Sequence, residues 1–419
     1  MKKLRVLLVG SGGREHALAE ALSRSPALGA LYAAPGNPGI AALAQIVPLQ
    51  ADDVEGLANF AAEHGIDLVV PGPEVPLVKG LADACAERGI ACAGPSASAA
   101  QLEGSKAFTK DVADKAGIPT ARWKRFDAGS ATVADAQSWV RQQGAPIVIK
   151  ADGLAAGKGV VVATTVEEAE EAVAHLGLPL VVEECLVGEE VSLFAFCNGT
   201  DAVLIGAARD HKRAFDGDKG PNTGGMGALC PPPGFGRAAQ EAALDQTVRP
   251  MLREMAQRGT PFKGVIFAGL MLTATGPQLI EYNVRFGDPE AEALLPRMTS
   301  DLLLALHAMA EGKLPESAIT FTDDAAVSLV LAAEGYPGTP RKGGVIEGLE
   351  EAEATAPGIK VFQAGTKRRD DGALVADGGR VLTISATAPT LEGARAKAYK
   401  AAGKIRWADK FCRSDIGQA

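Results

Sequence analysis

Strands that alternate with helices and end in glycine- or proline-rich loops occupy the first hundred residues, and this pattern restricts the fold more than any other feature. Leu4–Val9 is an apolar, β-prone run that stops at a glycine-rich segment, and a helical periodicity begins at Arg14. Two further apolar runs, ending at Val70 and near Ala91, are each followed by a loop of the same kind. This alternation predicts a doubly wound parallel sheet, which we place at residues 1–101.

The remainder of the 419 residues exceeds what one core holds and divides by pattern into three parts. Residues 102–122, helical in pattern with a stop at Pro119, join residues 190–320 in a central domain of apolar strands and a helix. Residues 123–189 carry the strands and helix of a small α+β lobe. Residues 321–419 are strand-rich and end in a helix, which predicts a C-terminal α/β domain. The expected fold class is therefore mixed, α/β and α+β.

Composition and charge exclude several classes of function. The net charge of −9 gives an acidic surface that repels phosphate backbones, so nucleic acid is not an expected partner. The six cysteines form no CxxC pair, and the five histidines show no zinc-ligand spacing. No run approaches the roughly 18 apolar residues of a membrane span. We therefore expect a reduced, cytoplasmic protein without a disulfide framework or a membrane segment.

The first glycine-rich loop, residues 10–13, follows a strand and opens a helix, as dinucleotide-binding loops do. Gly10 and Gly12 fit that fingerprint, but Glu15 stands where the third glycine is needed, and no acidic ribose ligand follows at the expected distance. A dinucleotide is therefore disfavoured. Backbone N–H groups at a helix N-terminus, together with Arg14, instead suit a small phosphorylated metabolite. A tight turn without a ligand is the alternative.

A second glycine-rich loop, Lys150–Gly159, lies between two apolar strands. Three residues separate Gly153 from Gly157, and no Ser or Thr follows Lys158, so this is not a Walker A loop. The context fits a hairpin that closes over nucleotide phosphates, with Lys150 and Lys158 supplying positive charge. A surface hairpin with solvated lysines is the alternative.

The apolar strand at residues 180–184 runs into an acidic segment that ends at Glu190. Backbone groups after such a strand can pair with the edge of adenine, and a carboxylate a few residues on can hold ribose hydroxyls. The alternative is a solvated acidic turn, which is the commoner outcome for a short acidic run.

Glu281 and Asn283 form the most specific pair in the sequence. They are two residues apart in an apolar strand, so their side chains point to the same face. Oxygen ligands at that spacing suit Mg²⁺, which is usually held by a few protein oxygens plus substrate phosphates. Arg285, Asp288 and Glu290 follow directly. An exposed strand with chance Glu/Asn alternation is the alternative.

Two polar stretches, residues 209–213 and residues 220–227, lie close together in the sequence. The first is charged, and the second is rich in glycine. Their proximity suggests one ordered substrate loop, and a solvated basic turn followed by a long loop is equally open from the residues alone.

Together these segments resemble the phosphoribosylamine–glycine ligase family of the ATP-grasp superfamily. The motifs that carry the resemblance run in order along the whole chain: VGSGGREHA at 9–17, PGN at 35–37, PGPE at 71–74, HKR at 211–213, GPNTGGMGA at 220–228, EYNVRFGDPE at 281–290 and FCRSDIG at 411–417. The resemblance implies an N-terminal substrate domain at 1–101, an ATP-grasp core at 102–122 and 190–320, a lid at 123–189 and a C-terminal domain at 321–419.

The resemblance also implies roles for individual residues. ATP would contact Lys106, Lys150, Lys158, Glu183, Glu184, Leu186 and Glu190. Mg²⁺ or Mn²⁺ would be held by Glu281 and Asn283. The substrates would meet Gly12, Gly13, Arg14, Asn37, Glu74, Asn222 and Thr223. Phosphoryl transfer would involve Asp210, Lys212 and Arg285. The chain departs from the expected pattern at Cys185, where the family has an aromatic residue, and at Leu270, where many ATP-grasp enzymes have a carboxylate.

The implied activity joins glycine to 5-phosphoribosylamine with ATP, through a glycyl phosphate, in de novo purine biosynthesis. The products would be glycinamide ribonucleotide, ADP and phosphate. We expect a monomer that makes transient contacts with neighbouring pathway enzymes. The rival hypotheses are an ATP-grasp ligase or carboxylase with another acid or amine, and a nucleotide sensor without catalytic activity.

Overall fold

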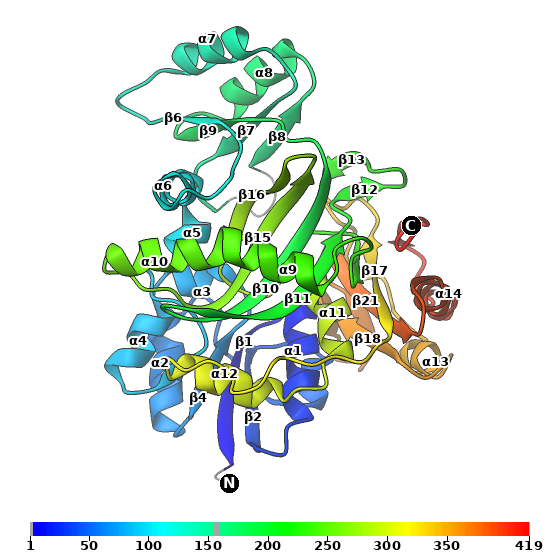
Figure 1. Cartoon of the computed structure of the whole chain (residues 1–419). Helices are drawn as coiled ribbons and strands as arrows, with labels where there is room; N and C mark the ends of the chain where they lie inside the picture. The colour runs from blue at the N-terminus through cyan, green and yellow to red at the C-terminus, as the bar shows by residue number, and fades with distance from the viewer. Residues whose placement is uncertain (1–2, 155–158, 419) are drawn as a thin grey trace.

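A computed structural model describes residues 3–154 and 159–418 of the chain. Three sheets dominate it: a parallel sheet of five strands near the N-terminus, an antiparallel sheet of nine strands, and a separate sheet of four strands (Figure 1). The mixed fold class expected from the sequence is confirmed. Within the described residues, no helix is long and apolar enough to cross a membrane.

The N-terminal sheet has the order β3-β2-β1-β4-β5, and every neighbouring pair is parallel. Its central strand is fully buried from Val6 to Val9, because helices cover both faces of the sheet. The elements are β1 (Leu4–Gly10), α1 (Gly13–Ser23), β2 (Leu28–Pro35), β3 (Gln45–Ile46), α2 (Val54–Glu63), β4 (Leu68–Pro71), α3 (Glu74–Val78), α4 (Leu81–Glu87) and β5 (Ala91–Cys92). The glycine- and proline-rich loops therefore gather at the carboxyl edge, where ligands of such sheets bind.

The nine-stranded sheet continues from the central part of the chain into the C-terminal part. β14 pairs with β17, and this joins the strands β16 (Gly276–Asn283), β15 (Lys263–Thr273), β10 (Glu189–Asn198), β11 (Ala202–Asp210) and β14 (Gly227–Cys230) to β17 (Ala325–Ala333), β21 (Arg380–Ala388) and β18 (Ile359–Gln363), with β22 (Lys410–Phe411) beside β17. The boundary that we place at residue 320 therefore crosses a continuous sheet, and the domain division stays a prediction.

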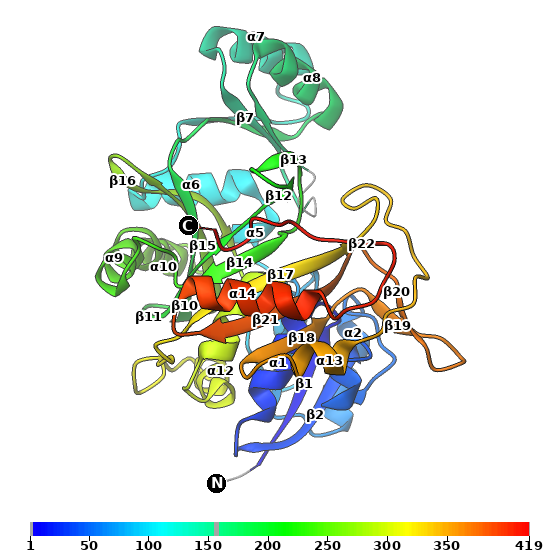
Figure 2. The ribbon, with the colours of Figure 1, turned by 90° about the vertical axis from the view of Figure 1, so that its right-hand side faces the viewer.

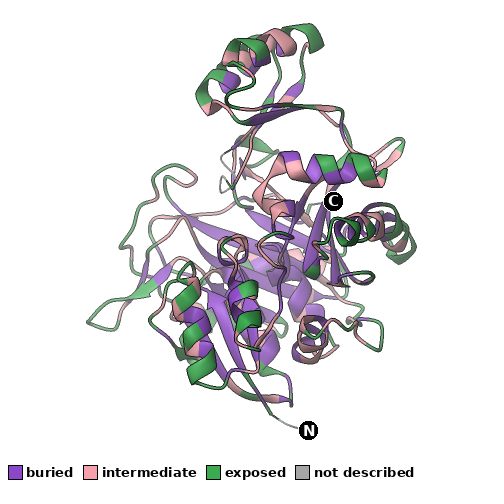
Figure 3. Cartoon of the chain, turned by 90° about the vertical axis from the view of Figure 1, so that its left-hand side faces the viewer, coloured by how far each residue is buried: buried purple, intermediate pink, exposed green. Residues whose placement is uncertain are grey.

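Residues 123–184 contain the separate sheet, which stands apart from the rest of the chain (Figures 1 and 3). The strand order is β6-β9-β7-β8, and the helices α7 and α8 cover one face of the sheet. The elements in chain order are β6 (Trp123–Phe126), α7 (Val133–Gln143), β7 (Ile147–Ala151), β8 (Val160–Ala163), α8 (Val166–Leu176) and β9 (Leu180–Glu184). Phe126, Val140 and Ile149 belong to a core cluster of its own. This lobe with its own core is the part that we expect to be a lid, and that role stays a prediction; we call residues 123–184 the lid.

The helix expected over residues 102–122 is shorter and is broken. It forms α5 (Gln101–Gly104) and α6 (Lys106–Ala116). Ser105 is extended and its side chain caps α6 by accepting from the Phe108 N–H, so the two helices meet at an angle. Gly117 then adopts a φ of +66°, which ends α6 before Pro119 is reached.

Several elements between residues 202 and 411 were not expected from the sequence. They are β11, β14, the hairpin β12 (Arg213–Phe215) and β13 (Lys219–Asn222), α9 (Arg237–Ala243), a π-helical turn (Leu244–Val248), α10 (Arg249–Gln257), α11 (Glu290–Leu294), α13 (Leu349–Glu353), β19 (Thr366–Arg368) and β20 (Leu374–Ala376). The expected helices near residues 301–311 and 391–404 are α12 (Leu302–Ala310) and α14 (Leu391–Ala402). In Figure 2, α14 lies across β17 and β21 and covers the C-terminal end of the sheet.

Candidate active site

A buried triad of charges lies between the lid and the central sheet. Glu183, at the end of β9, places one carboxylate oxygen 2.9 Å from Lys150 Nζ and the other 2.9 Å from Lys110 Nζ. The three side chains are at most 5% exposed. Although burial alone would raise the pKa of Glu183, the two ammonium groups hold it below its ordinary value. The carboxylate is therefore ionised and shared.

Lys106, the first residue of α6, makes hydrogen bonds to the beginning of the second glycine-rich loop. Its Nζ donates to the Gly153 carbonyl at 2.8 Å, and Asp152 Oδ1 accepts from the Lys106 N–H at 2.7 Å. Burial, helped by the charge of Lys150, lowers the pKa of Lys106 below its ordinary value. Lys158, the other lysine expected at ATP, lies outside the described residues.

Glu281 and Asn283 lie at the end of β16, in a strand as expected. Lys212 lies close to Glu281. Its Nζ pairs with Glu190 on β10 and lies 4.0 Å from Glu281 Oε1. Burial would raise the pKa of Glu281, but Lys212, Lys150 and Lys106 lower it, so this carboxylate is ionised at neutral pH. The structure thus brings together Glu190 on β10, Glu281 on β16 and Lys212, which lies between β11 and β12.

A divalent metal fits this pair of side chains. Asn283 is buried, its Oδ1 accepts one hydrogen bond from Arg285 at 3.0 Å, and its Nδ2 has no partner among the described residues. No group of three or more His, Cys, Asp or Glu side chains in the described part of the chain could hold a metal alone. One carboxylate and one amide oxygen would therefore need phosphate or water oxygens as further ligands, which is how Mg²⁺ is usually held.

Arg285 lies at the centre of an ion-pair network between the N-terminal domain and β16. Its Nη2 donates to Glu103 Oε1 at 2.8 Å, and its Nε lies 3.4 Å from Glu74 Oε2. The second oxygen of Glu103 accepts from the Val284 N–H at 2.7 Å. Burial would raise the pKa of Glu74, but Arg285 and Arg14 lower it. Glu103 therefore holds both the guanidinium and the backbone beside it.

The pH dependence of this network follows from Glu103, because burial and the nearby Glu74 carboxylate raise its pKa to about 7, against the opposing charge of Arg285. As the pH falls through 7, Glu103 takes up a proton and its hold on Arg285 weakens. Turnover is expected to decline on this side of neutrality. The Glu103→Gln variant, which stays neutral, should be slower than the wild type at pH 8.5 and approach its rate near pH 6.

The stability of the fold should depend on the same protonation in the opposite direction. It should rise as the pH falls, whereas turnover declines. Between its ordinary pKa of 4.5 and about 7, Glu103 binds a proton in the folded chain but not in the unfolded chain. Its contribution to the free energy of unfolding is therefore complete below pH 4.5, declines by on the order of 3 kcal/mol up to pH 7, and is constant above. Urea unfolding of Glu103→Gln and wild type across this range measures the difference, with the exposed Glu87→Gln as control. The role of Glu103 in this pH dependence would be contradicted if two quantities did not change with pH: the ratio of the turnover rates of Glu103→Gln and the wild type, and the difference between their free energies of unfolding.

The first glycine loop encloses a carboxylate where a dinucleotide loop leaves room for a helix to pack. Glu15 Oε2 accepts from the Gly12 N–H and Oε1 accepts from Arg14 Nε, both at 2.6 Å. A Cβ on Gly72 would lie 2.0 Å from Glu15 Oε1, so a side chain there would displace Glu15. Glu15 therefore occupies the space beside Gly10 and Gly72, which is the structural reason why this loop does not fit the dinucleotide-binding pattern.

Arg14 is buried and tied to Glu15, and its Nη1 also donates to the Phe286 carbonyl at 3.2 Å. Gly12 and Gly13 begin α1 beside it. Asn37 has all its hydrogen-bonding positions engaged: it donates to the carbonyls of Ser11 and Gln363 and accepts from two backbone N–H groups. In this structure Asn37 therefore organises the loops, which leaves its predicted substrate contact untested.

The polar stretches at 209–213 and 220–227 do form one ordered unit. Thr223 is buried and both its N–H and its hydroxyl donate to the Lys212 carbonyl, at 2.8 and 2.9 Å. Asp210 Oδ1 is buried without a partner among the described residues. Burial, reinforced by Glu290, raises the pKa of Asp210 well above its ordinary range. Asn222 ends β13, is partly buried, and pairs with Arg213 in the hairpin.

Gly225 is the tightest point of this unit. Its φ is +110°, and a Cβ would lie 2.3 Å from Pro289 Cδ and 2.6 Å from Asp210 Oδ1. The Gly225→Ala variant is expected to lose on the order of 3 kcal/mol of unfolding free energy, from backbone strain plus the clash. Gly234, with a φ of +74° and open space around it, is the matched control and should lose about 1 kcal/mol. Equal losses in urea unfolding would show that the clash is absent.

The remaining predicted ATP contacts lie around the turn after β9. Glu184 is exposed and pairs with Arg122 at 3.1 Å, while its N–H donates to the Arg122 carbonyl. Leu186 is partly buried, and so is Cys185, the departure from the expected aromatic residue. Leu270 on β15 is fully buried in the core. None of these contacts tests the predicted roles.

Sequence reasoning missed Lys110, Glu103, Asp152 and Arg380. Arg380 pairs with Asp288 at 3.1 Å and donates to its carbonyl, which connects β21 to the loop after β16. Lys110 follows Lys106 by one helical turn, so helical spacing on the expected segment was the available signal. The others depend on contacts between distant segments, for which the sequence has no local pattern.

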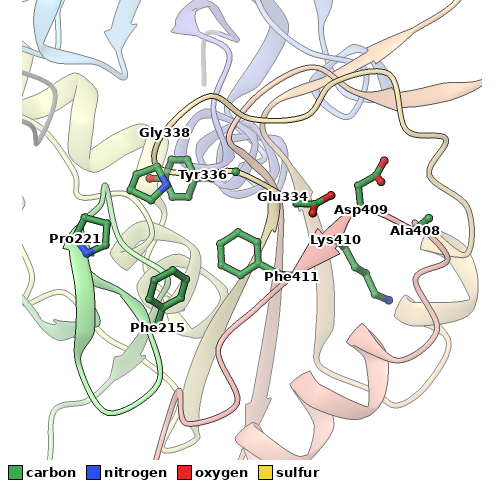
Figure 4. A pocket seen from close by; sticks show the side chains of 11 residues that line it. Phe215, Pro221, Glu334, Tyr336, Gly338, Ala408, Asp409, Lys410 and Phe411 are labelled. Carbon is green, nitrogen blue, oxygen red and sulfur yellow. The ribbon is translucent and has the colours of Figure 1, made fainter.

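A cavity of about 730 Å³ lies beside the stretch at 220–227, from which Pro221 lines it (Figure 4). Phe215, Tyr336 and Phe411 surround it, and the Tyr336 hydroxyl accepts from the Gly224 N–H at 3.0 Å. None of the residues that line it is among the predicted site residues. The candidate active site is therefore the cluster around Glu183, Glu281 and Arg285.

The fold and the site together define a class of protein. A small four-stranded lobe stands over an antiparallel sheet, lysines gather where the two meet, and a Glu/Asn pair ends a strand beside them. This is the arrangement of an ATP-grasp enzyme, a fold that binds ATP.

Comparison with known proteins specifies the family. Models of phosphoribosylglycinamide synthetase match in order: the N domain at residues 4–103, the ATP-grasp (A) domain at 104–291 and the C domain at 326–419. A phosphoribosylamine–glycine ligase of Brucella melitensis is 52% identical over 99% of this chain and 97% of its own length. A chloroplastic relative from Arabidopsis thaliana is 48% identical over 96% of this chain and 78% of its own length. The chain belongs to the phosphoribosylamine–glycine ligase family.

Solved structures agree with this assignment. The crystal structure of the phosphoribosylamine–glycine ligase from Thermotoga maritima superposes with a TM-score of 0.83 at 32% identity and covers 99% of this chain and 100% of its own. A biotin carboxylase domain from Hydrogenobacter thermophilus, solved with MgADP and bicarbonate, has a TM-score of 0.74 at 17% identity and covers 98% of this chain and 92% of its own. At that identity the second likeness concerns the fold alone.

Proposed function

We propose that this chain joins glycine to 5-phosphoribosylamine at the cost of one ATP, giving glycinamide ribonucleotide, ADP and phosphate in purine biosynthesis. The observation that carries the proposal is the convergence of Glu281 and Asn283 with three lysines, Lys106, Lys150 and Lys212, in a chain of this family. Carboxylate–amine ligation needs a nucleotide site with that balance of charge, because ATP must convert a poor acyl donor into a good one.

The reaction proceeds in two steps. The glycine carboxylate attacks the γ-phosphate, forming glycyl phosphate and releasing ADP. The amine of phosphoribosylamine then attacks the glycyl carbonyl, and phosphate leaves as the amide bond forms. Since neither step needs a covalent enzyme nucleophile, catalysis consists of positioning and charge neutralisation.

We assign the nucleotide to the residues at the lid. Lys106, Lys150 and Lys158 neutralise the phosphates of ATP, and Glu183, Glu184, Leu186 and Glu190 contact its base and ribose. Glu281 and Asn283 hold Mg²⁺ or Mn²⁺, which when bound neutralises charge on the phosphate oxygens. The lysines around these carboxylates support this assignment, because Lys110 and Lys150 share Glu183, and Lys212 pairs with Glu190 and lies near Glu281.

We assign the substrates to the loops on the other side of Arg285. Gly12, Gly13 and Arg14 bind the phosphate of phosphoribosylamine at the N-terminus of α1, with Asn37 and Glu74 nearby. Asn222 and Thr223 shape the glycine site. Asp210 and Lys212 orient the reacting carboxylate, and Arg285 stabilises charge that develops on the transferred phosphoryl group. The ion pair between Arg285 and Glu74 supports this division, because it connects the two halves of the site.

The domain division at residues 101, 123, 189 and 320 and the monomeric state belong to the same proposal. So do transient contacts with neighbouring pathway enzymes and a cytoplasmic location.

The proposal is tested by ADP release from Mg²⁺, ATP and glycine, with and without phosphoribosylamine made in situ from ribose 5-phosphate and ammonia. Turnover is expected only when both glycine and the amine are present. Bicarbonate-dependent turnover without glycine would instead indicate a carboxylase, and ATP binding without any turnover would indicate a nucleotide sensor.

A further inference from the structure

Lys110 is a buried lysine in the candidate site to which no role has been assigned above. Its side chain is 2% exposed, and its Nζ lies 2.9 Å from Glu183 Oε2 and donates to Thr120 Oγ1 at 2.7 Å. A buried lysine is costly unless it is paired, so its position is set by these two partners.

The charges around Glu183 do not balance. Lys110 and Lys150 each approach one oxygen of the same carboxylate, so the triad carries two positive charges and one negative charge. Lys106 lies on the preceding turn of α6, where its Nζ donates to the Gly153 carbonyl and the Asp152 carboxylate lies beside it. Glu281 attracts Lys150 and Lys106 at longer range, but its ion pair is with Lys212. With Asp152 beside Lys106 and Glu281 paired with Lys212, the net positive charge belongs to the triad of Lys110, Lys150 and Glu183, where an anion would offset it.

Lys110 also connects the lid to β16, the strand that carries Glu281 and Asn283. Thr120, which accepts its hydrogen bond, donates in turn to the Leu279 carbonyl on β16 at 2.6 Å, and the Leu279 N–H donates to the Pro119 carbonyl. Glu183 is on the lid strand β9. One side chain on α6 therefore fixes Glu183 relative to the strand that carries Glu281.

We propose that Lys110 is a positioning residue for nucleotide binding: it neutralises Glu183, so that Lys150 keeps its positive charge for the phosphates of ATP. Without Lys110, Glu183 and Lys150 would form a one-to-one ion pair, and the phosphate would have to compete with a buried carboxylate for Lys150. This inference rests on the proposed function only in that ATP is the nucleotide.

The test compares Lys110→Met, Glu183→Gln and the double variant, with Lys115→Met as control. Lys115 is on the same helix and exposed. Lys110→Met leaves the lysine–carboxylate pair without excess charge, whereas the double variant again carries one positive charge, on Lys150, as the wild-type triad does. Calorimetric titration gives the Kd for ATP, thermal unfolding gives Tm, and steady-state kinetics separate the KM for ATP from kcat.

Lys110→Met is expected to weaken ATP binding about tenfold or more, through KM rather than kcat, and to have a much smaller effect in the Glu183→Gln background, whatever Glu183 itself contributes to binding. Lys115→Met should bind as the wild type does. A merely structural Lys110 would lower Tm without charge-dependent rescue. The inference is overturned if Lys110→Met binds ATP normally, or if Lys110→Met weakens binding as much in the Glu183→Gln background as in the wild type.

These outcomes are distinguishable from failure of the proposed function. If the wild type binds ATP but needs a different acid or amine for turnover, the proposed ligation fails, and the series of Kd values still tests Lys110. If the wild type does not bind ATP at all, both fail together.

Discussion

Replacing Glu281 with alanine is expected to lower turnover by roughly a thousandfold, equivalent to about 4 kcal/mol of barrier, because it removes the carboxylate that would hold the metal against the phosphates. The fold should survive, since Lys212 keeps Glu190 as its ion-pair partner. Turnover is measured at saturating ATP and Mg²⁺, and the far-ultraviolet spectrum and Tm report the fold.

Two further variants make the Glu281 result interpretable. Glu281→Gln keeps the shape and removes the charge, so a loss as large as that of Glu281→Ala would show that the charge matters. Gln278→Ala, on the same strand and outside the site, should turn over normally. Turnover like that of the wild type in Glu281→Ala would rule out the metal assignment.

Replacing Arg285 with lysine should lower kcat by about a hundredfold or more, because lysine lacks the planar fork that contacts several oxygens at once. Arg285 donates to Glu103 and Asn283 and pairs with Glu74. Lysine keeps the charge but reaches at most part of this set. Steady-state kinetics with glycine and the amine varied separately measure the effect.

Arg285→Met should add a loss of stability of about 3 kcal/mol, because it leaves two partly buried carboxylates without their shared cation. The surface residue Arg237, which pairs with Glu241 one helical turn away, offers Arg237→Lys and Arg237→Met as controls. A kcat within about threefold of the wild type in Arg285→Lys would contradict the role of the guanidinium, since the expected loss is much larger.

The parts of the fold that the sequence predicted are those with a strong local signal. The buried strand β1 is apolar from Val6 to Val9, and β7, β8 and β9 of the lid begin with apolar runs of three or four residues. β6 was missed because its sequence, WKRF, is short and has two exposed, charged residues between its two aromatic residues. α10 was missed because only three of its residues are buried.

The candidate site shows the same division. The shared face of Glu281 and Asn283 follows from the two-residue period of a strand, which needs no tertiary information. The contact between Glu103 and Arg285 joins residues 182 positions apart, and the triad of Lys110, Lys150 and Glu183 requires a helix and two lid strands to meet. No local pattern encodes such contacts, so only the folded chain reveals which lysines share which carboxylate.

The central claim, that ATP activates the carboxylate of glycine, is tested most directly by the fate of its oxygen atoms. Glycine labelled with ¹⁸O in the carboxylate is turned over with ATP, Mg²⁺ and phosphoribosylamine, and the released inorganic phosphate is analysed by mass spectrometry. Formation of glycyl phosphate predicts one ¹⁸O atom in each phosphate, because the attacking oxygen leaves with the phosphoryl group. Unlabelled phosphate at full turnover would contradict the account, since ATP would then be cleaved without transfer to glycine.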